Sequence, residues 1–402
     1  MIPLEEALDH IRAHVHPLGP ERVELDAGLR AVAAEDVRAL WPVPPFDNSA
    51  VDGFAVPDSG TGPGRVELRI AGSVAAGDPG DVPVGPGTAV RITTGAPMPP
   101  GAVAVAMVED AVVDEVAGTV LLEQAPLAGA HVRRAGEDVG AGDLTVAAGT
   151  TLGPAHLGLL ASVGHGDVLV VRRPVVAVGS TGAELVEPGS PLGPGRIPDA
   201  NRQLLLANCR AAGLRTVDLG RAGDDVAEVE ELLARGARSA DVVLTSGGVS
   251  MGDFDPVKAA LARTEGARWM QIAVKPAKPF AFGLVDGVPV LGLPGNPVSS
   301  AVSFELLVRP TLHLLGGAGL RSGPVVAAIA GPGLGRRRDG KVHYVRVRLE
   351  RGPDGRPLAQ SAGAQGSHQL SALAAADGLA VLPDGVGPSP GEPVDVLLLP
   401  SV

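Results

Sequence analysis

Residues 241–255 read DVVLTSGGVSMGDFD, an apolar run followed by a pair of glycines and then by acidic side chains. The run at 241–244 has the length and composition of a buried strand, and the pattern that follows predicts a helix from about 256 to 263. Similar runs of strand-like, glycine-rich and helical sequence lie on both sides. The stretch therefore predicts one unit of a layered α/β fold.

The same alternation extends from about residue 173 to 317. Strands are expected at 175–178, 215–219, 241–244 and 289–293, and helices at 201–212, 226–237, 256–263 and after LPGNP (293–297). Strands that alternate with helices indicate a parallel sheet. Ligands of such sheets bind beyond the carboxyl ends of the strands, which is where the glycine-rich segments fall.

The sequence before this region shows a different pattern of apolar and turn-forming residues. Apolar side chains at helical spacing in 4–15 predict an amphipathic helix, and 152–163 predicts another, started by Pro154 and stopped by Gly164. Between 43 and 140, short alternating segments broken by glycine and proline predict a small β domain.

From about residue 322 the pattern is again that of strands. Val345, Val347 and Leu349 alternate with Arg346 and Arg348, and turn-forming clusters follow, which predicts a second small barrel or sandwich. The expected domains are a discontinuous N-terminal helical and linker domain (1–42 and 141–172), an inserted β domain (43–140), an α/β domain (173–317) and a C-terminal β domain (322–402).

Composition narrows the class of protein. The 402 residues carry 33 basic and 45 acidic side chains, a formal charge of −12, which argues against a nucleic-acid partner. The single cysteine, Cys209, lies in an apolar helical pattern and is expected to be a buried core thiol. No stretch approaches 18 consecutive apolar residues and the N-terminus lacks a signal-peptide pattern, so we expect a soluble cytoplasmic protein without a membrane partner.

Only four of the 33 basic side chains are lysine, and two of these flank a short turn in KPAKP, at Lys275 and Lys278. Arginine is a planar fork, whereas lysine is a compact point charge. A chain that otherwise uses arginine but keeps two lysines here is expected to bind a small anion or a phosphate with them. The competing interpretation is chance survival of two lysines on a solvated loop.

Two glycine-containing loops are candidate phosphate sites. The segment Ser246–Ser250 follows a buried strand, and its glycines would let backbone N–H groups approach a phosphate, although plain turns share this pattern. In Pro294–Pro297, Asn296 suits a helix N-cap and Pro297 the first helical position, which predicts a helix N-terminus available to an anion, or an ordinary capped helix.

Acidic residues collect at the same predicted edge of the sheet. They follow the first, second and third strands, as Glu184, Asp224, Asp225, Asp253 and Asp255. Several acids facing a phosphate site usually indicate Mg²⁺, which one or two carboxylates hold together with phosphate oxygens. Taken singly, each acid could instead cap a helix or stabilise a turn.

The inserted β domain offers weaker signals. In FDNSAVDGFA (46–55), Asp52 could serve as an acid or base, although a turn residue that accepts backbone N–H bonds is the simpler interpretation. Arg133 with Gly136, Glu137 and Asp138 could form a salt-bridged turn and nothing more. The histidines show no metal-ligand spacing and Cys209 has no partner, so zinc is not expected, and neither a P-loop nor a G-x-S-x-G elbow is present.

Seven motifs occur in order along about 250 residues: FDNSAVDGFA (46–55), RITTGAP (91–97), RRAGEDV (133–139), GSTGAEL (179–185), TSGGVSMGDFD (245–255), KPAKPFAFG (275–283) and LPGNPVSS (293–300). Together with QGSHQLSALAAADGLAVLP near the C-terminus, they closely resemble the molybdopterin molybdenumtransferases. This is the MoeA family, which includes the E domain of gephyrin. The resemblance implies a multidomain α/β plus β fold, with a central adenylyltransferase-like, molybdopterin-binding α/β domain and a C-terminal β-barrel.

The resemblance implies an enzyme of the last step of molybdenum cofactor synthesis. Such an enzyme binds adenylylated molybdopterin, inserts molybdate into its dithiolene and hydrolyses the adenylate with Mg²⁺, releasing AMP. Family members are homodimers whose active site lies between the α/β domain of one subunit and the β-rich part of the other. The adenylyltransferase of the preceding step is a further candidate partner.

The functional residues of the family can be assigned to this sequence wherever its motifs match. The implied catalytic residues are Asp52, Thr94, Asp138, Glu184, Asp224 and Asp255, with Glu184 and Asp255 as metal ligands. The implied substrate-binding residues are Asn48, Ser49, Arg133, Ser180, Thr181, Gly182, Asn201, Ser246, Gly247, Gly248, Ser250, Pro294, Gly295, Asn296 and Pro297. The implied molybdate-binding residues are Lys275, Lys278, Ser299, Lys341 and Ser367.

The chain departs from the family pattern at five places. Ala183 stands where relatives have Asp, Ala277 replaces a glycine, and Gln271 replaces a common lysine. The segment RIPDAN (196–201) replaces a more typical I-Y-D-S-N, and Lys341 lies where relatives tend to have arginine. These departures bear on efficiency and metal preference, and they leave the implied reaction class unchanged.

Three alternatives remain from the sequence. The upstream adenylyltransferase resembles 173–317 but lacks the β domains, and a scaffold like gephyrin would need linker and trimerising domains that this sequence lacks. The third is a paralogue of the same fold that uses tungstate, or that acts as a non-catalytic molybdopterin-binding or scaffold protein.

Overall fold

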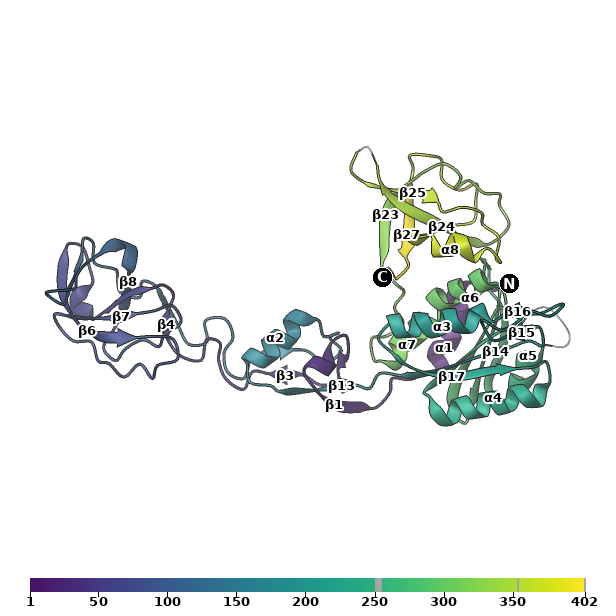
Figure 1. Ribbon diagram of the computed structural model, residues 1–402, viewed down its shortest axis with the longest axis horizontal. Helices are drawn as coiled ribbons and strands as arrows, with labels where there is room; N and C mark the ends of the chain where they lie inside the picture. The colour runs from purple at the N-terminus through teal and green to yellow at the C-terminus, as the bar shows by residue number, and fades with distance from the viewer. Residues whose placement is uncertain (250–254, 353, 401–402) are drawn as a thin grey trace. The chain divides into compact units, whose positions relative to one another are not determined.

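The computed structural model describes residues 1–249, 255–352 and 354–400 (Figure 1). The chain forms two compact units: unit 1 is Met1–Glu21 together with the chain from Val171 onward, and unit 2 is Arg22–Val170. The predicted N-terminal helical and linker domain is divided between them, since its first helix lies in unit 1 and its second in unit 2. The domain boundaries taken from the sequence stay predictions.

A six-stranded sheet forms the centre of unit 1. Its strands, in spatial order, are β17 (Arg215–Ala222), β14 (Val175–Thr181), β18 (Val242–Ser246), β22 (Val288–Leu293), β21 (Pro279–Val285) and β19 (Glu265–Gln271). The first four strands are parallel to one another, as the alternation of strands and helices predicts. Strand β21 departs from that pattern, because it runs antiparallel to both of its neighbours.

The reversal of β21 comes from a tight hairpin that our sequence analysis missed. Strands β21 and β22 are joined by Asp286 and Gly287 alone, and both residues have positive φ, 50° and 78°. Two central residues with positive φ form the turn whose twist suits a two-residue hairpin, and Asp-Gly is its common sequence. The dipeptide was therefore a usable signal for the hairpin.

Helices cover both faces of this sheet (Figure 1). One face carries α1 (Leu4–His14), α3 (Ala200–Ala211), α6 (Pro297–Ser303) and α7 (Arg309–Leu315), the last two joined by a π-helical turn (Phe304–Val308). The other face carries α4 (Val226–Ser239) and α5 (Pro256–Leu261). The expected amphipathic N-terminal helix and the helices between the strands are thus confirmed.

Strand alternation separates the two cores. Val176 and Val178 of β14 pack with Leu206 of α3, whereas Ala177 between them packs with Leu232 of α4. Cys209 lies in the first of these cores, as expected, and burial raises the pKa of its thiol to about 12.

The C-terminal domain is a closed five-stranded barrel. Its strands are β24 (Val342–Arg351), β25 (Pro357–Ser361), β23 (Val325–Ala330), β27 (Pro393–Leu398) and β26 (Gly378–Leu382), which pairs with β24 to close the barrel. A short helix, α8 (Leu370–Ala374), connects two of them. A two-residue strand of the α/β domain, β20 (Val274–Lys275), pairs in parallel with β24 and joins the KPAKP loop to the barrel.

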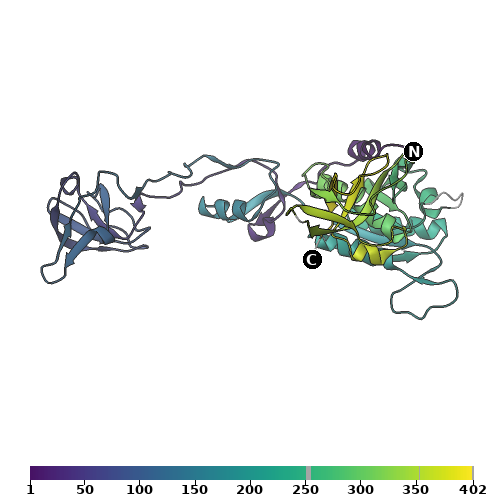
Figure 2. The same cartoon turned by 90° about the horizontal axis from the view of Figure 1, so that it is seen from above.

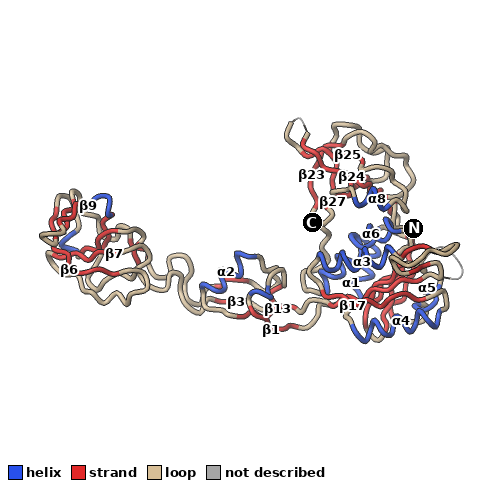
Figure 3. Tube along the Cα trace, viewed as in Figure 1, coloured by secondary structure: helices blue, strands red, loops and turns tan. Residues whose placement is uncertain are grey.

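Unit 2 consists mainly of strands and loops (Figure 3). Its larger sheet contains, in spatial order, β8 (Ala104–Met107), β5 (Gly53–Val56), β7 (Thr88–Ile92), β6 (Val66–Val74), β10 (Thr119–Leu122) and β9 (Ala111–Asp114). Smaller pairings join β1 (Pro20–Glu24) and β2 (Val32–Ala33) to β13 (Asp167–Val171), β3 (Val37–Arg38) to β12 (Leu144–Val146), and β4 (Asn48–Ser49) to β11 (Val132–Arg133). The predicted second helix is α2 (Pro154–Ser162), with Pro154 at its first position.

Candidate functional site

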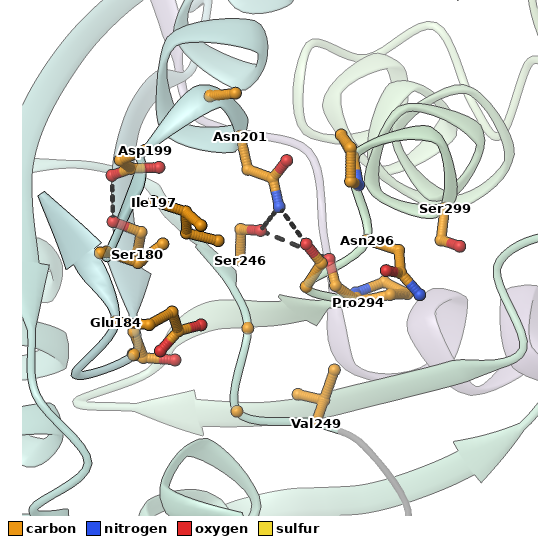
Figure 4. A pocket seen from close by; sticks show the side chains of 18 of the residues that line it. Ser180, Glu184, Ile197, Asp199, Asn201, Ser246, Val249, Pro294, Asn296 and Ser299 are labelled. Atoms are coloured by element: carbon orange, nitrogen blue, oxygen red, sulfur yellow. Dashed lines mark hydrogen bonds between the residues drawn. The ribbon is translucent and has the colours of Figure 1, made fainter. Parts of the chain in front are cut away.

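A cavity of about 640 Å³ lies at the carboxyl ends of the parallel strands of unit 1 (Figure 4). The loops after β14, β18 and β22 form most of its wall. It brings together the following residues that the sequence nominated: Ser180, Thr181, Gly182, Glu184, Asn201, Asp224, Ser246, Gly247, Gly248, Asp255, Pro294, Gly295, Asn296, Pro297 and Ser299. The nominated Ser250 and Asp253 lie outside the described residues.

Glycines allow these loops to approach one another closely. Gly247 has a φ of +94°, and a β-carbon there would lie 2.4 Å from the carbonyl oxygen of Thr181. A β-carbon at Gly295 would lie 3.6 Å from the Cα atom of Gly247. Any side chain at 247 would therefore separate the loops, and the glycines leave main chain exposed to a ligand.

Asn201 ties the start of α3 to two of the loops (Figure 4). Its Nδ2 atom donates to Ser246 Oγ at 2.7 Å and to the carbonyl oxygen of Gly295 at 2.7 Å. The Ser246 hydroxyl in turn donates to the carbonyl oxygen of Pro294 at 3.3 Å. One amide side chain thus fixes the separation of the loops that follow β18 and β22.

The start of α6 has features of both structures predicted for LPGNP, an ordinary capped helix and a helix N-terminus available to an anion. Asn296 occupies the N-cap and Pro297 the first helical position, as predicted. The Asn296 side chain makes no capping hydrogen bond, however, and it lines the cavity together with the buried Ser299. The helix therefore begins at the cavity with polar side chains turned toward it.

Three of the nominated acids line the cavity: Glu184, Asp224 and Asp255. Asp224 accepts a hydrogen bond from the N–H of Ala183 at 3.3 Å, beside Glu184 in the chain. Asp225 caps α4 by accepting from the N–H of Ala227 at 2.8 Å, so for this acid the helix-cap interpretation is confirmed.

The acids suit a metal ion that also binds substrate. Within the ranges that the structure describes, no three or more carboxylate, histidine or cysteine side chains are grouped closely enough to enclose a metal. Mg²⁺ needs no such enclosure, because it commonly takes one or two carboxylates and completes its shell with phosphate oxygens and water. The carboxylate oxygens in the cavity wall therefore fit Mg²⁺.

The two lysines of KPAKP lie apart from this cavity wall. Lys278 is half-buried and its carbonyl oxygen accepts from the N–H of Ile272 at 2.7 Å, while the next residue, Pro279, lines the cavity. Lys275 is exposed, pairs in register with His343 of the barrel, and lines a second cavity of about 400 Å³. The lysines thus occupy the junction between the α/β domain and the barrel.

The two molybdate candidates of the barrel differ in position. The carbonyl oxygen of Ser367 accepts from the N–H of Val298 at 3.1 Å, so this loop touches the start of α6, one residue from Ser299. Lys341 lies 3.7 Å from the carboxylate of Asp339, outside the linings of both cavities. Only Ser367 is therefore directly joined to the wall of the main cavity.

Arg346 is a residue of this region that our sequence analysis missed. The alternation along β24 grouped it with the polar side of the strand, but its side chain is 0% exposed. Its Nη2 atom donates to the carbonyl oxygens of Ala364 at 2.8 Å and Gly366 at 3.2 Å, and Nε and Nη1 have no hydrogen-bond partner in the described part of the chain. Burial lowers the pKa of this guanidinium.

Arg346 lines neither the main cavity nor the second cavity, and its place is defined by the loop that covers it. Its guanidinium touches the loop that carries Ser367, and that loop touches the start of α6. A buried cation with donors left over is unfavourable unless a ligand satisfies it. The sequence signal for this buried position was the QGSHQ segment (365–369), whose loop covers Arg346.

The nominated residues of unit 2 form a separate set. Asp52 accepts hydrogen bonds from the N–H of Thr94 at 2.7 Å and from its hydroxyl at 2.9 Å, and these bonds lower the pKa of the exposed Asp52 carboxyl. Asp52 thus accepts a backbone N–H bond, as the simpler interpretation expected, but from a segment 42 residues away and not within its own turn. Asn48 and Arg133 are register partners in β4 and β11.

The predicted salt-bridged turn belongs to another arginine. Arg134, the neighbour of the exposed Arg133, pairs with Asp47 at 2.6 Å and its N–H donates to Glu137 at 3.0 Å. Asp138 is exposed and its N–H donates to the carbonyl oxygen of Val43 at 3.0 Å. Every described residue that lines the main cavity belongs to unit 1, so Asn48, Ser49, Asp52, Thr94, Arg133 and Asp138 lie outside it.

Ala277, which replaces the glycine of the family motif, adopts a φ of +87° and is 3% exposed. Changing Ala277 to glycine should alter the free energy of unfolding by less than about 1 kcal/mol. Glycine relieves about 1–2 kcal/mol of backbone strain at positive φ. This gain is offset because a buried methyl group is lost and because the unfolded chain gains conformational entropy. Ala277→Val should destabilise by about 3 kcal/mol, since a β-branched residue at positive φ adds strain and overpacks the site. Urea denaturation of both variants measures the difference.

Comparison with known proteins agrees with the whole architecture. Residues 2–164 match the MoeA N-terminal region (domain I and II), 177–314 match a probable molybdopterin binding domain, and 336–399 match the MoeA C-terminal region (domain IV). Among the described residues, no helix combines the length and apolar character that crossing a membrane would require.

Individual relatives match over nearly the full length. Molybdopterin molybdenumtransferase 2 of Mycobacterium tuberculosis is 40% identical over 379 residues, covering 91% of this chain and 92% of the relative. Molybdopterin molybdenumtransferase of Haemophilus influenzae is 38% identical over 399 residues, covering 98% of each. A crystal structure of molybdopterin biosynthesis MoeA protein from Pyrococcus horikoshii is 33% identical with a TM-score of 0.81, covering 99% of both chains. The chain therefore belongs to the MoeA family, whose curated members are molybdopterin molybdenumtransferases.

Proposed function

We propose that this chain inserts molybdenum into adenylylated molybdopterin and hydrolyses the adenylate, giving molybdenum cofactor and AMP. The observation that carries the proposal is the single cavity at which the glycine-rich loops, the acids and the start of α6 meet, in a chain of this family. Main-chain N–H groups suit phosphate and acids suit a metal, so one cavity offers the chemistry of a phosphoanhydride site. No observation favours the non-catalytic or tungstate alternatives.

Binding of the substrate falls to the glycine-rich loops. The loop at Gly247 and Gly248 and the start of α6 form the wall against which the phosphates bind, although the N–H groups of Gly247 and Val298 already donate to the carbonyl oxygens of Leu293 and Ser367. Asn201 holds these loops at a fixed separation. Because these contacts are preformed, they orient the phosphoanhydride without further ordering of the protein.

Glu184, Asp224 and Asp255 would hold Mg²⁺ beside the phosphates. The ion, when bound, neutralises charge on the phosphoanhydride and polarises its phosphorus–oxygen bonds. The carboxylates themselves fix where positive charge can sit and can orient a water molecule toward the adenylate phosphorus. The alanine at 183 leaves these three acids without the additional carboxylate common in the family.

Molybdate would bind at the junction of the α/β domain and the barrel. Lys275 and Lys278 supply point charges from the KPAKP loop, Ser299 and Ser367 supply hydroxyls from the two sides of the contact at Val298, and Lys341 adds charge from the barrel. Arg346 contributes a buried guanidinium with donors to spare. Such fixed cations can hold a tetrahedral dianion next to the dithiolene.

The unit 2 residues would reach an active site through a second copy of the chain. Asp52, Thr94, Arg133 and Asp138 carry polar side chains that the cavity of unit 1 does not use, and the resemblance to the MoeA family implies homodimers with composite sites. We therefore propose a cytoplasmic homodimer in which these residues, with Asn48 and Ser49, complete the site. The adenylyltransferase that makes the substrate is the proposed upstream partner.

The direct test is release of AMP. Purified protein given adenylylated molybdopterin, molybdate and Mg²⁺ should release AMP, measured by chromatography, and should yield cofactor that activates a purified apo-molybdoenzyme. A chelator should lower the rate at least about 100-fold, because the charge of the phosphoanhydride is then uncompensated. Comparing the rates of AMP release with molybdate and with tungstate shows which oxyanion the enzyme prefers. The proposal would be overturned if this protein released no AMP under conditions in which the M. tuberculosis relative does.

A further inference from the structure

A network of ion pairs around the buried Arg202 adjoins the cavity wall. Arg202, whose side chain is 4% exposed, donates from Nε to Asp199 at 2.9 Å, from Nη1 to both oxygens of Asp218 at 2.6 Å, and from Nη2 to Glu187 at 2.5 Å. Asp199 also accepts a hydrogen bond from the hydroxyl of Ser180, and both of these residues line the cavity (Figure 4). One arginine therefore binds three carboxylates, and of these three Asp199 lines the cavity.

The three carboxylates come from three different elements. Asp199 caps α3, where it accepts from the N–H of Arg202 at 3.1 Å, and Asp218 lies in the edge strand β17. Burial alone would raise the pKa of Asp218, but hydrogen bonds from the N–H of Gly220 and from Arg202 lower it. The hydrogen bonds that Arg202 donates to the three carboxylates raise the pKa of its guanidinium, although burial alone would lower it. Arg202 and Asp218 are therefore both charged at neutral pH.

The third carboxylate, Glu187, belongs to a flap over the cavity. We define the flap as residues 182–199, which contain the short strands β15 (Leu185–Val186) and β16 (Ile197–Pro198) and an exposed connection that projects as a loop (Figure 2). Within it, the N–H of Ile197 donates to the carbonyl oxygen of Glu184 at 2.9 Å. Glu184 is thus held by the flap, three residues before Glu187.

We propose that Glu187 and Arg202 form a clamp that positions Glu184 in the cavity. Both are positioning residues, because they act through the flap and not through contact with the reacting atoms. The inference rests on the proposed function for the role of Glu184, but the clamp itself is a property of the protein alone. It also explains why Arg202 binds more acid than one positive charge can neutralise: it fastens helix α3, strand β17 and the flap at one point.

Glu187 is the member of the network whose replacement should leave the domain folded. Removing Arg202 would leave the buried Asp199 uncompensated and could unfold the domain. The Glu187 side chain is 53% exposed, so its loss leaves the Asp199 and Asp218 pairs in place. Glu187→Ala removes the clamp, and Glu187→Gln keeps a carbonyl oxygen that can still accept from Arg202. Glu231→Ala is the control, since it removes a similarly exposed glutamate that pairs with the exposed Arg238 on α4.

Limited trypsin digestion tests the clamp without substrate. Arg196 is exposed in the flap, and cleavage of the Arg196–Ile197 bond, quantified by mass spectrometry, reports opening of that segment. Glu187→Ala should speed this cleavage about 5-fold relative to cleavage after Arg65 in unit 2, because a charge-assisted hydrogen bond no longer holds the flap. Glu187→Gln should fall between Glu187→Ala and the unchanged protein, and Glu231→Ala should match the unchanged protein. Equal cleavage in all four proteins would overturn the clamp.

The kinetics of AMP release test whether the clamp positions Glu184 for the reaction. Glu187→Ala should lower the maximal rate of AMP release about 10-fold with a smaller change in KM, since misplacement of a catalytic group by a fraction of an ångström affects the reaction more than binding. Faster cleavage with an unchanged rate would show that the clamp holds the flap but does not position Glu184. If the unchanged protein released no AMP, the proposed function would fail while the digestion result still decided the clamp.

Discussion

Replacing Glu184 by glutamine should lower the maximal rate of AMP release by about 100-fold to 1,000-fold, the range measured when a single preorganised electrostatic group is removed from an active site. Glutamine has nearly the same size as glutamate but carries no charge, so the flap and the cavity wall should keep their shape. Single-turnover AMP release at saturating substrate measures the effect. The affinity for adenylylated molybdopterin should change by less than about 5-fold, because the glycine-rich loops carry most of the phosphate contacts.

The Mg²⁺ dependence of the same variant tests the proposed role more closely. If Glu184 binds the ion, the Mg²⁺ concentration needed for half-maximal rate should rise about 10-fold or more in Glu184→Gln, since one of very few protein ligands has lost its charge. Glu231→Gln, on the exposed side of α4, is the control for general charge effects. A variant with the rate and the Mg²⁺ dependence of the unchanged protein would remove Glu184 from the mechanism.

The gathering of the loops in one cavity could be predicted from sequence because it follows from topology. Once strands and helices alternate, the segments after Thr181, Ser246 and Leu293 must lie at one edge of the sheet. The same reasoning failed for β21, where Asp286 and Gly287 reverse the chain within two residues. The alternation rule describes whole units of strand and helix, and a hairpin between two strands lies outside it.

Contacts between domains could not be predicted in this way. The pairing of Lys275 with His343 involves a strand of two residues, too short to leave a periodic signal. Alternation along β24 correctly separated the two sides of the strand, but it could not tell that the side with Arg346 is covered by the loop before α8. A polar position in an alternating strand is exposed only if nothing packs over it, and that depends on segments distant in sequence.

The buried guanidinium of Arg346 leads to the second large effect. Replacing Arg346 by methionine should raise the KM for molybdate about 10-fold to 100-fold, because a desolvated charge-assisted contact to the oxyanion is lost. The KM for adenylylated molybdopterin should stay within about 3-fold, since none of the glycine-rich loops donates to or accepts from Arg346 in the described structure. Initial rates at varied molybdate and at varied pterin measure the two constants separately.

The same substitution should leave the protein as stable as before or more stable, by up to about 2 kcal/mol, when no molybdate is present. Methionine fills a similar volume and removes two unsatisfied donors, each of which costs about 1–3 kcal/mol, although the carbonyl oxygens of Ala364 and Gly366 lose their partner. A purely structural arginine would leave the KM for molybdate unchanged, and added molybdate would stabilise the variant as much as the unchanged protein. Urea denaturation with and without molybdate distinguishes the two roles, and Arg346→Lys, which keeps the charge and loses the fork, should fall between them in molybdate KM.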